Sequence, residues 1–304
     1  MSLVDRVKRR LRLHPRALLH SLLTYPRFLG RIKPDLMRGR EQEVVALLQA
    51  LDRRWEPATL KTPVGRRLLV VAPHPDDESI GAGGLLLAHR GLSETHIINV
   101  FNGEGGGRLS DSPWVDDPDY RSALVAARRA ELEAAGKVIG AASIHYLDLR
   151  DGITAPNMKD AGRLRDVVRQ VQPDVVLLPW YLDNQRDHRV VNILYAWGCG
   201  EVDCVVLGFE VWRLCQPNAV LDISPWADEK VKLVKTYQTQ TATIDYAAYV
   251  GGLARTRAFL HPVRPDRGGA AEAFFALPGR DYCDLVQGFY GGPERLTPVA
   301  REIL

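Results

Sequence analysis

The sequence has few cysteines and no long apolar run. Its four cysteines, Cys199, Cys204, Cys215 and Cys283, are spaced neither as a CxxC metal site nor as a small disulfide scaffold. We therefore expect buried, reduced thiols. No stretch approaches the ~18 uncharged apolar residues that a membrane-spanning helix needs. The first twelve residues mix Leu and Val with Arg and Lys, unlike a secretory signal, so we expect a cytoplasmic protein.

The sequence also lacks internal repeats and low-complexity segments. Hydrophobic residues make up 46% of its 304 residues and charged residues 25%, which is typical of a soluble globular protein and excludes collagen-like and disordered classes. It carries no recognisable nucleic-acid-binding motif, so we expect no nucleic-acid partner. Nothing in the pattern predicts an oligomeric state.

The net charge of +3 is unevenly distributed. Residues 1–40 hold eleven basic and two acidic residues, a net charge of +9, which leaves −6 on the rest of the chain. Four leucines at helical spacing, between Pro15 and Pro26, suit a short helix in peripheral contact with an anionic membrane surface. A helix packed on the body with a solvated basic face fits the same pattern. We expect a basic N-terminal arm with short helices at 1–60 and a single α/β domain at 61–304.

Short apolar runs alternate with amphipathic segments from residue 64 onward, which predicts βαβ units in a mostly parallel, Rossmann-like sheet with helices on both faces. The expected strands are Leu68–Ala72, His96–Phe101, Ile144–Leu149, Val175–Pro179, Val205–Trp212 and Ala219–Ile223. The expected helices are Ser79–His89, Tyr120–Val138, Ala161–Val171, His188–Trp197, Pro225–Tyr237 and Ile244–Phe259. Ligands of such a sheet bind beyond the carboxyl ends of its strands, so we expect the functional residues just after each apolar run.

Ionisable side chains cluster directly after the first run, in His74-Pro75-Asp76-Asp77-Glu78-Ser79, ahead of the glycine-rich segment 81–84. An imidazole at His74 and a carboxylate at Asp77 can converge across a strand-to-helix turn. This donor pair suits Zn²⁺ or Fe²⁺ in an open site, with Asp76 free for acid–base work. The simpler interpretation, a helix N-cap with acids favoured by the helix dipole, explains only part of the cluster.

A second cluster follows the Val175–Pro179 run. It reads Asp183-Asn184-Gln185-Arg186-Asp187-His188-Arg189 and precedes an expected helix. Because the carboxyl ends of parallel strands share one edge of a sheet, His188 can reach the first cluster as a third ligand.

These motifs together resemble the PIG-L/LmbE family of metal-dependent de-N-acetylases. Weaker matches are the segments 102–105, 128–131 and 149–152, and the resemblance runs from about residue 67 to at least residue 189. The resemblance implies a zinc-dependent hydrolase, with Fe²⁺ as the other suitable ion, that removes the acetyl group from an N-acetylated amino sugar of the N-acetylglucosamine type. A lipid- or glycan-linked sugar would suit a membrane-contacting arm.

The resemblance also implies roles for single residues. His74, Asp77 and His188 match the zinc ligands, and Asp76 matches the general base that deprotonates a metal-activated water. Arg129 and Asp151 match sugar-contacting positions, and we add Glu78 as an expected substrate contact. Gln185 stands where the family commonly has a histidine, and its amide can donate a hydrogen bond but cannot supply a proton near neutral pH.

Two alternatives remain open. The loss of the proton-donating histidine at Gln185 is compatible with a non-catalytic sugar-binding protein on the same fold. The segment Gly103-Glu104-Gly105-Gly106-Gly107 follows an expected strand, as in a nucleotide- or S-adenosylmethionine-dependent transferase. No transferase accounts for His74, Asp77 and His188 together.

Overall fold

Strands and helices alternate along most of the chain in the computed structural model, which describes residues 57–109, 117–264, 266 and 268–304. The predicted membrane contact through residues 1–40 lies outside these residues, as does nearly all of the arm. Among the described helices, none is both long enough and apolar enough to cross a bilayer. The four cysteines are buried and free.

One eight-stranded sheet forms the centre, in the order β1-β7-β8-β6-β5-β2-β3-β4. Its strands are β1 (Ala58–Thr59), β2 (Arg67–Ala72), β3 (Glu94–Phe101), β4 (Ala141–Leu149), β5 (Val175–Pro179), β6 (Val205–Phe209), β7 (Ala219–Asp222) and β8 (Ala271–Pro278). All neighbouring pairs are parallel except those of β8, which is antiparallel to β6 and β7. The predicted mostly parallel α/β sheet is therefore confirmed.

Helices cover both faces of the sheet. Successive side chains of a strand point to opposite faces, and the side chains on both faces are apolar and need to be buried. Leu69 and Val71 pack with helices on one side, whereas Leu68 and Val70 pack with helices on the other. The first side holds α8 (Met158–Val171), α9 (Arg186–Gly198) and α13 (Gly279–Tyr290). The second holds α6 (Asp77–His89), α7 (Pro118–Ile139), α10 (Ala227–Val234) and α12 (Tyr246–Leu260).

Local capping sets where the helices begin. The Asp117 carboxylate accepts two backbone N–H bonds at the start of α7, Asn157 caps α8, and Gln185 caps α9. Each cap satisfies amide groups that a helix start leaves without partners. A one-turn helix, α11 (Gln238–Thr241), and a short 3₁₀ turn at Ser224–Trp226 complete the segment around α10.

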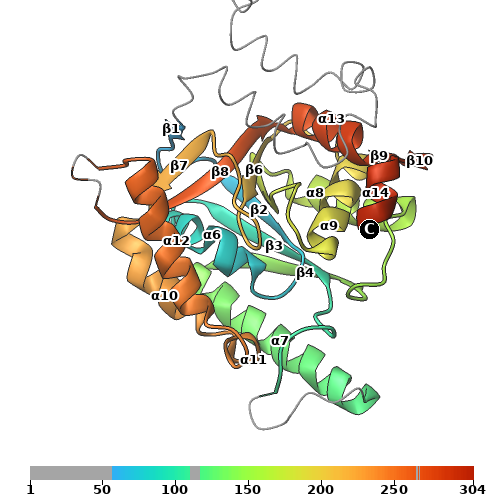
Figure 1. The fold of residues 1–304 in the computed structure, drawn as a ribbon, viewed down its shortest axis with the longest axis horizontal. Helices are drawn as coiled ribbons and strands as arrows, with labels where there is room; N and C mark the ends of the chain where they lie inside the picture. Colours follow the sequence, from blue (N-terminus) through green and yellow to red (C-terminus); the bar gives the residue numbers. More distant parts are fainter. Residues whose placement is uncertain (1–56, 110–116, 265, 267) are drawn as a thin grey trace, which may run out of the picture.

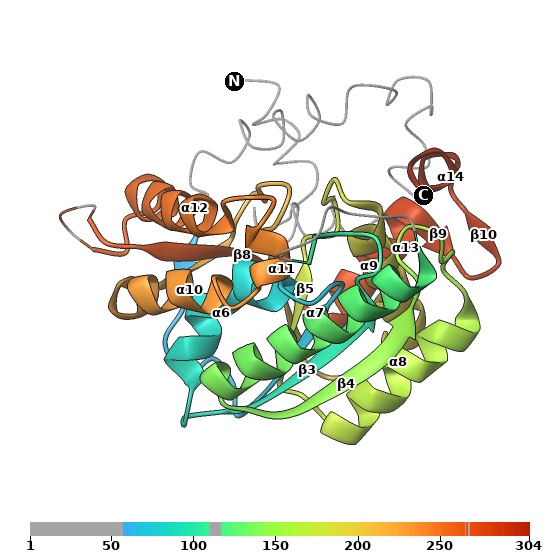
Figure 2. The same ribbon diagram turned by 90° about the horizontal axis from the view of Figure 1, so that it is seen from below.

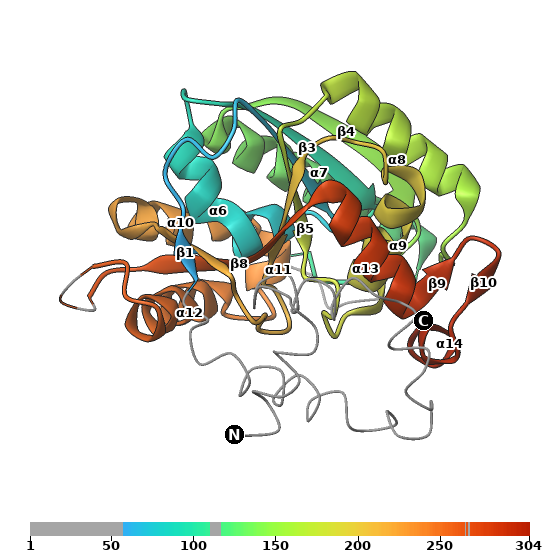
Figure 3. The same cartoon turned by 90° about the horizontal axis from the view of Figure 1, so that it is seen from above.

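Three expectations about the fold need correction. The predicted strand Val205–Trp212 ends at Phe209, because Glu210 turns inward to pair with Arg257. Strand β8 was not predicted, and Figure 2 shows it running beside α10 and α12. Helix α13 was not predicted either, and Figure 3 shows it following β8 and lying against α9. The chain ends with a small two-stranded sheet, β9 (Gly291–Gly292) and β10 (Arg295–Leu296), and α14 (Pro298–Ile303).

Candidate metal centre and cavity

The candidate site lies where the order of the strands reverses. Along the chain, β2 is followed outward by β3 and β4, whereas β5 and β6 lie on the other side of β2. The loops that leave the carboxyl ends of β2 and β5 therefore separate in opposite directions and leave a crevice between them. These loops carry the two clusters that the sequence singled out.

His74, Asp77 and His188 converge in this crevice, and each offers one donor atom within 4.8 Å of the others. The Asp77 Oδ2 atom lies 3.3 Å from His74 Nδ1 and 3.2 Å from His188 Nε2. Donor atoms placed tetrahedrally around Zn²⁺ lie about 3.3 Å apart, since metal–ligand distances are about 2.0–2.1 Å. Both ring nitrogens of His188 are buried and, within the described part of the chain, make no hydrogen bond. The donor set and its spacing therefore fit a divalent metal ion.

A carboxylate backs each imidazole on its other side. Asp187 Oδ2 lies 3.2 Å from His74 Nε2, and Asp183 Oδ1 lies 3.5 Å from His188 Nδ1. Asp187 and Asp183 are both almost fully buried. Such outer carboxylates orient metal-binding imidazoles in proteins.

The electrostatics of the crevice are dominated by carboxylates. Burial alone lowers the pKa of His74, but bonds to Asp187 and Asp77 outweigh it and raise the pKa to about 10. Burial also opposes protonation of His188, where the charge of Asp77 raises the pKa to about 9. Burial acts to raise the pKa of Asp77, yet His188 holds it below its usual range. This excess of negative charge is the environment that a bound cation would neutralise.

Asp76 is held in a strained backbone conformation beside the donor set. Its φ of 136° is rare for a residue with a side chain and costs about 1–3 kcal/mol. Its N–H donates to Glu78 Oε2 at 3.3 Å, and its carbonyl accepts bonds from Ser79 and Ile80 in the first turn of α6. Burial and the charge of Asp77 raise the pKa of Asp76 to about 8, while Arg128, 3.7 Å away, acts in the opposite direction.

Glu78 does not line the cavity. It is fully buried, accepts a hydrogen bond from Ser79 Oγ at 2.5 Å, and accepts another from the Tyr237 hydroxyl. Burial raises the pKa of its carboxyl group. Glu78, which we expected to contact the substrate, therefore lies outside the cavity and accepts a hydrogen bond from the backbone of Asp76.

Arg129 lies outside the cavity as well. It pairs with Asp148 at 2.6 Å and stacks over the Tyr146 ring. Its neighbour Arg128 is buried instead at the cavity wall and donates to Pro75, Gly103 and Gly106 carbonyl oxygens. Adjacent residues of a helix point about 100° apart, so only packing decides which of the two arginines faces the site.

Asp151 and Gln185 both line the cavity. The Asp151 carboxylate accepts the N–H groups of Gly103 and Gly105 at 2.9 and 3.0 Å. The glycine-rich loop therefore binds a protein carboxylate where a transferase would bind a cofactor phosphate. Gln185 Oε1 accepts the amides of Asp187 and His188 as the α9 cap, so its NH₂ group is the part left for the cavity.

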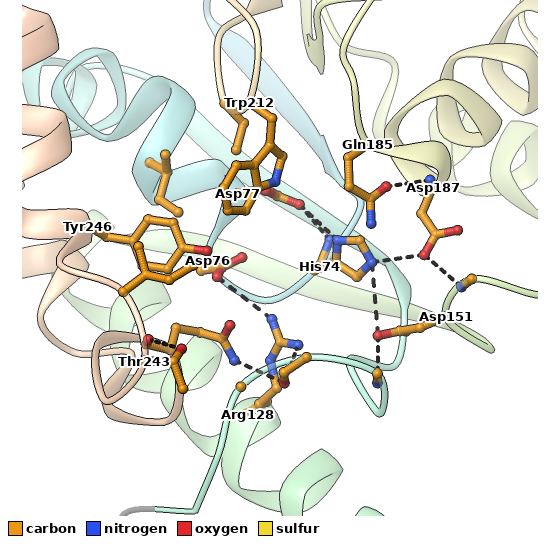
Figure 4. A pocket seen from close by; sticks show the side chains of 18 residues that line it. His74, Asp76, Asp77, Arg128, Asp151, Gln185, Asp187, Trp212, Thr243 and Tyr246 are labelled. Carbon is orange, nitrogen blue, oxygen red and sulfur yellow. Dashed lines mark hydrogen bonds and ion pairs between the residues drawn. The ribbon is translucent and has the colours of Figure 1, made fainter. Parts of the chain in front are cut away.

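The cavity has a volume of about 350 Å³ and is lined by both polar and apolar side chains. Figure 4 shows Arg128, Asp151 and Asp187 below and beside His74, with Trp212 and Tyr246 on the other side. Of the aromatic residues near the site, Trp212 lines the cavity, whereas Tyr237 is fully buried behind it. The glycines after Asp77 allow close packing, since a Cβ at Gly81 would lie 2.0 Å from the Phe209 ring.

Sequence reasoning did not single out Asp183, Asp187, Arg128 or Tyr246. The first three lie within the motifs described above, so the sequence could have indicated that they are near the site. Tyr246, at the start of α12, had none.

Together, the fold and the crevice define a Rossmann-like α/β protein with a candidate metal centre at its switch point. Residues 69–196 match the family model described as PIG-L: GlcNAc-PI de-N-acetylase. The resemblance of this segment to the PIG-L/LmbE-like family, which the motifs predicted, is therefore confirmed.

Three known proteins illustrate the similarity. The diacetylchitobiose deacetylase of Thermococcus kodakarensis is 25% identical over 199 residues, covering 58% of this chain and 70% of that protein. The structure of the N,N'-diacetylchitobiose deacetylase from Pyrococcus horikoshii, complexed with its inhibitor MPG, superposes with a TM-score of 0.60 and 20% identity, covering 80% of this chain and 94% of that one. The 4-oxalmesaconate hydratase of Pseudomonas putida is 33% identical over 110 residues, covering 36% of this chain and 42% of that protein.

Proposed function

We propose that this protein is a metal-dependent hydrolase that removes the acetyl group from an N-acetylglucosamine-type sugar. The observation that carries the proposal is the convergence of His74, Asp77 and His188 with a further carboxylate, Asp76, beside them. The family match and the deacetylases among the relatives support the same activity.

His74, Asp77 and His188 would hold the ion, with Zn²⁺ favoured by two imidazoles and one carboxylate and Fe²⁺ as the second choice. When bound, the ion would make water more acidic and polarise the amide carbonyl. Asp187 is hydrogen-bonded to His74, and Asp183 lies 3.5 Å from His188, so both carboxylates stand where they can orient the imidazoles.

Asp76 is the proposed general base. Its carboxylate lines the cavity and accepts a proton from the water that attacks the acetamide carbonyl. The water oxygen ends in acetate, the C–N bond breaks, and Asp76 passes the proton to the leaving nitrogen. The strained φ of Asp76 is the structural condition for presenting this carboxylate to the cavity.

Gln185 serves as a hydrogen-bond donor to the oxygen that becomes negative during the attack. Its carbonyl oxygen is held by the α9 amides, which leaves the NH₂ group for this task. Asp151 and Arg128 are the proposed polar contacts of the sugar, and Arg128 takes the place expected of Arg129.

The test combines metal analysis with acetate release from an N-acetylglucosamine glycoside, for the wild type and Asp76→Asn. We expect about one zinc ion per chain in both proteins, because Asp76 is not a ligand. The rate of acetate release should fall by about 10²–10⁴ in the variant, the usual worth of a general base. A variant as active as the wild type, or a wild type that binds sugar without releasing acetate, would reject the mechanism or the enzyme assignment.

A hydratase is the second candidate, because one relative carries that name. The substrate named there is a carboxylate, and such a substrate needs cationic contacts. The cavity has four aspartates, Asp76, Asp77, Asp151 and Asp187, and Arg128 is its single cationic Lys or Arg among the described lining residues. Most of the N–H groups of Arg128 are used by backbone carbonyls. The charge of the cavity therefore favours a neutral sugar amide.

A further inference from the structure

The cavity has an apolar rim, formed by Val211, Trp212, Ile244 and Tyr246. Trp212 and Ile244 line the cavity yet remain 46% and 41% exposed, so the apolar wall continues outward to the surface. Figure 4 shows Trp212 and Tyr246 on the side away from Asp151 and Asp187. The proposed chemistry of deacetylation uses none of these four side chains.

Hydrogen bonds fix this rim in position. The backbone N–H of Trp212 donates to the buried Asp183 Oδ2 at 3.0 Å, and the Tyr249 hydroxyl donates to the Val211 carbonyl at 2.5 Å. The Trp212 and Tyr246 rings meet edge to face, with centroids 5.9 Å apart. An exposed tryptophan on a fixed backbone, packed against a second ring, offers apolar surface to a ligand at reduced entropic cost.

Two polar side chains next to the rim, Thr243 and Gln240, form hydrogen bonds within the protein. Thr243 Oγ1 donates to the Gln240 carbonyl at 2.9 Å, and Gln240 Nε2 lies within hydrogen-bond distance of Gly106 O and Thr239 Oγ1. Val211 and Ile244 offer no hydrogen-bonding group in their side chains to a second sugar ring. Aliphatic Val211 and Ile244 beside an aromatic ring instead suit a hydrocarbon group.

We propose that the apolar rim binds an alkyl or aromatic group attached to the sugar, so that the substrate class is an N-acetylglucosamine glycoside with an apolar aglycone. This inference rests on the proposed deacetylase function and extends it outward from the reacting acetamide.

The test compares the octyl and methyl glycosides of N-acetylglucosamine, of the same anomeric form, in acetate release by the full chain. We expect the wild type to favour the octyl glycoside about tenfold in kcat/KM, as partial burial of a hydrocarbon chain implies. Trp212→Ala should reduce this ratio to near one. Leu260→Ala, an exposed apolar residue of α12 outside the cavity, should leave the ratio unchanged.

Two outcomes would overturn the rim proposal. One is an octyl-to-methyl ratio that Trp212→Ala does not change. The other is an equal loss of kcat/KM in Trp212→Ala for N,N'-diacetylchitobiose and for the octyl glycoside, since the rim would then be a sugar subsite.

Measurements of glycoside binding distinguish a failure of the rim proposal from a failure of the proposed deacetylase function. If no glycoside releases acetate, the deacetylase assignment fails, and titration calorimetry with Asp76→Asn then decides the rim. The rim proposal holds if Asp76→Asn binds the octyl glycoside more tightly than the methyl glycoside and the double variant Asp76→Asn/Trp212→Ala does not. Equal binding of both glycosides overturns it.

Discussion

Two hollows lie at opposite edges of the same sheet, and the smaller one is the candidate site. The cavity at the carboxyl edge encloses about 350 Å³, whereas the hollow at the amino edge encloses about 920 Å³. The larger hollow is lined by charged residues too, among them Arg67, Arg169 and Asp174. Volume alone therefore does not identify the site.

The difference lies in what the charged groups do. At the amino edge, Asp174 accepts the N–H groups of Arg66 and Arg67, and the Arg67 guanidinium donates to the Val171 carbonyl. These bonds fasten loops to strand ends. At the carboxyl edge, carboxylates and imidazoles from two loops face one another around a shared centre. Parallel strands create this asymmetry because all of their carboxyl ends open onto one edge.

The largest effect is expected for the two histidines His188 and His89. His188→Ala removes a proposed ligand, so zinc content should fall and kcat/KM should drop by about 10³ or more, since the ion supplies several kcal/mol. His89→Gln, at the far end of α6, should keep both within about twofold. Metal analysis and acetate release measure the two effects. Equal losses in both variants would show that the two edges do not differ in function.

A smaller effect is expected for Arg128 and Arg169. Arg128→Ala leaves three carbonyls from the loops after β2 and β3 without their donor, so the free energy of unfolding should fall by about 3 kcal/mol. Arg169 is exposed at the amino edge, and Arg169→Ala should change that free energy by about 0.5 kcal/mol or less. Urea titrations of both variants make the comparison. Similar losses would contradict the structural role of Arg128.

Two aspartates flank β5, one at each edge of the sheet. Asp174 precedes the strand and Asp183 follows it, and each accepts two backbone N–H groups. We expect both Asn variants to lose similar stability, but only Asp183→Asn to weaken zinc binding, by about 10- to 100-fold, because Asp183 backs His188. Competition with a zinc-binding dye measures the affinity. An unchanged affinity in Asp183→Asn would remove the orienting role.

The smallest effect concerns the pH dependence of stability at the amino edge. Burial lowers the pKa of His89, whose Nε2 accepts the Val64 N–H at 2.9 Å. Below pH ~6.5 the unfolded chain binds a proton at this residue that the folded protein resists, so stability falls as the pH decreases. One proton limits the slope to about 1.4 kcal/mol per pH unit. His89→Gln should flatten the decline between pH 6.5 and 5 in urea titrations, and an unchanged slope would contradict this account.

The sequence predicted most of the parallel sheet because buried strands appear as short apolar runs between amphipathic helices. It did not predict β8, where Glu272 interrupts the apolar run Ala271–Leu277. That carboxylate is buried and paired with Lys230 at 2.6 Å, a partner 42 residues away. A local pattern does not contain such a distant partner.

In the candidate site, too, local motifs predicted some features and contacts between distant segments decided others. The donor types at His74, Asp77 and His188 and their positions after two strands predicted that they meet, and the structure places them together. Arg129 was expected at the sugar and Glu78 as a substrate contact, but packing gave the cavity Arg128 and put Glu78 behind Asp76.

The mostly parallel α/β fold, the donor types of the candidate site and the resemblance to a known family could all be predicted from the sequence alone, because strand patterning and motif spacing are local properties. Tertiary structure decided which charged side chains reach the cavity, which support it from behind, and that an apolar rim stands at its mouth. These depend on contacts between segments far apart in the chain, where a rotation of 100° along one helix exchanges one arginine for the next.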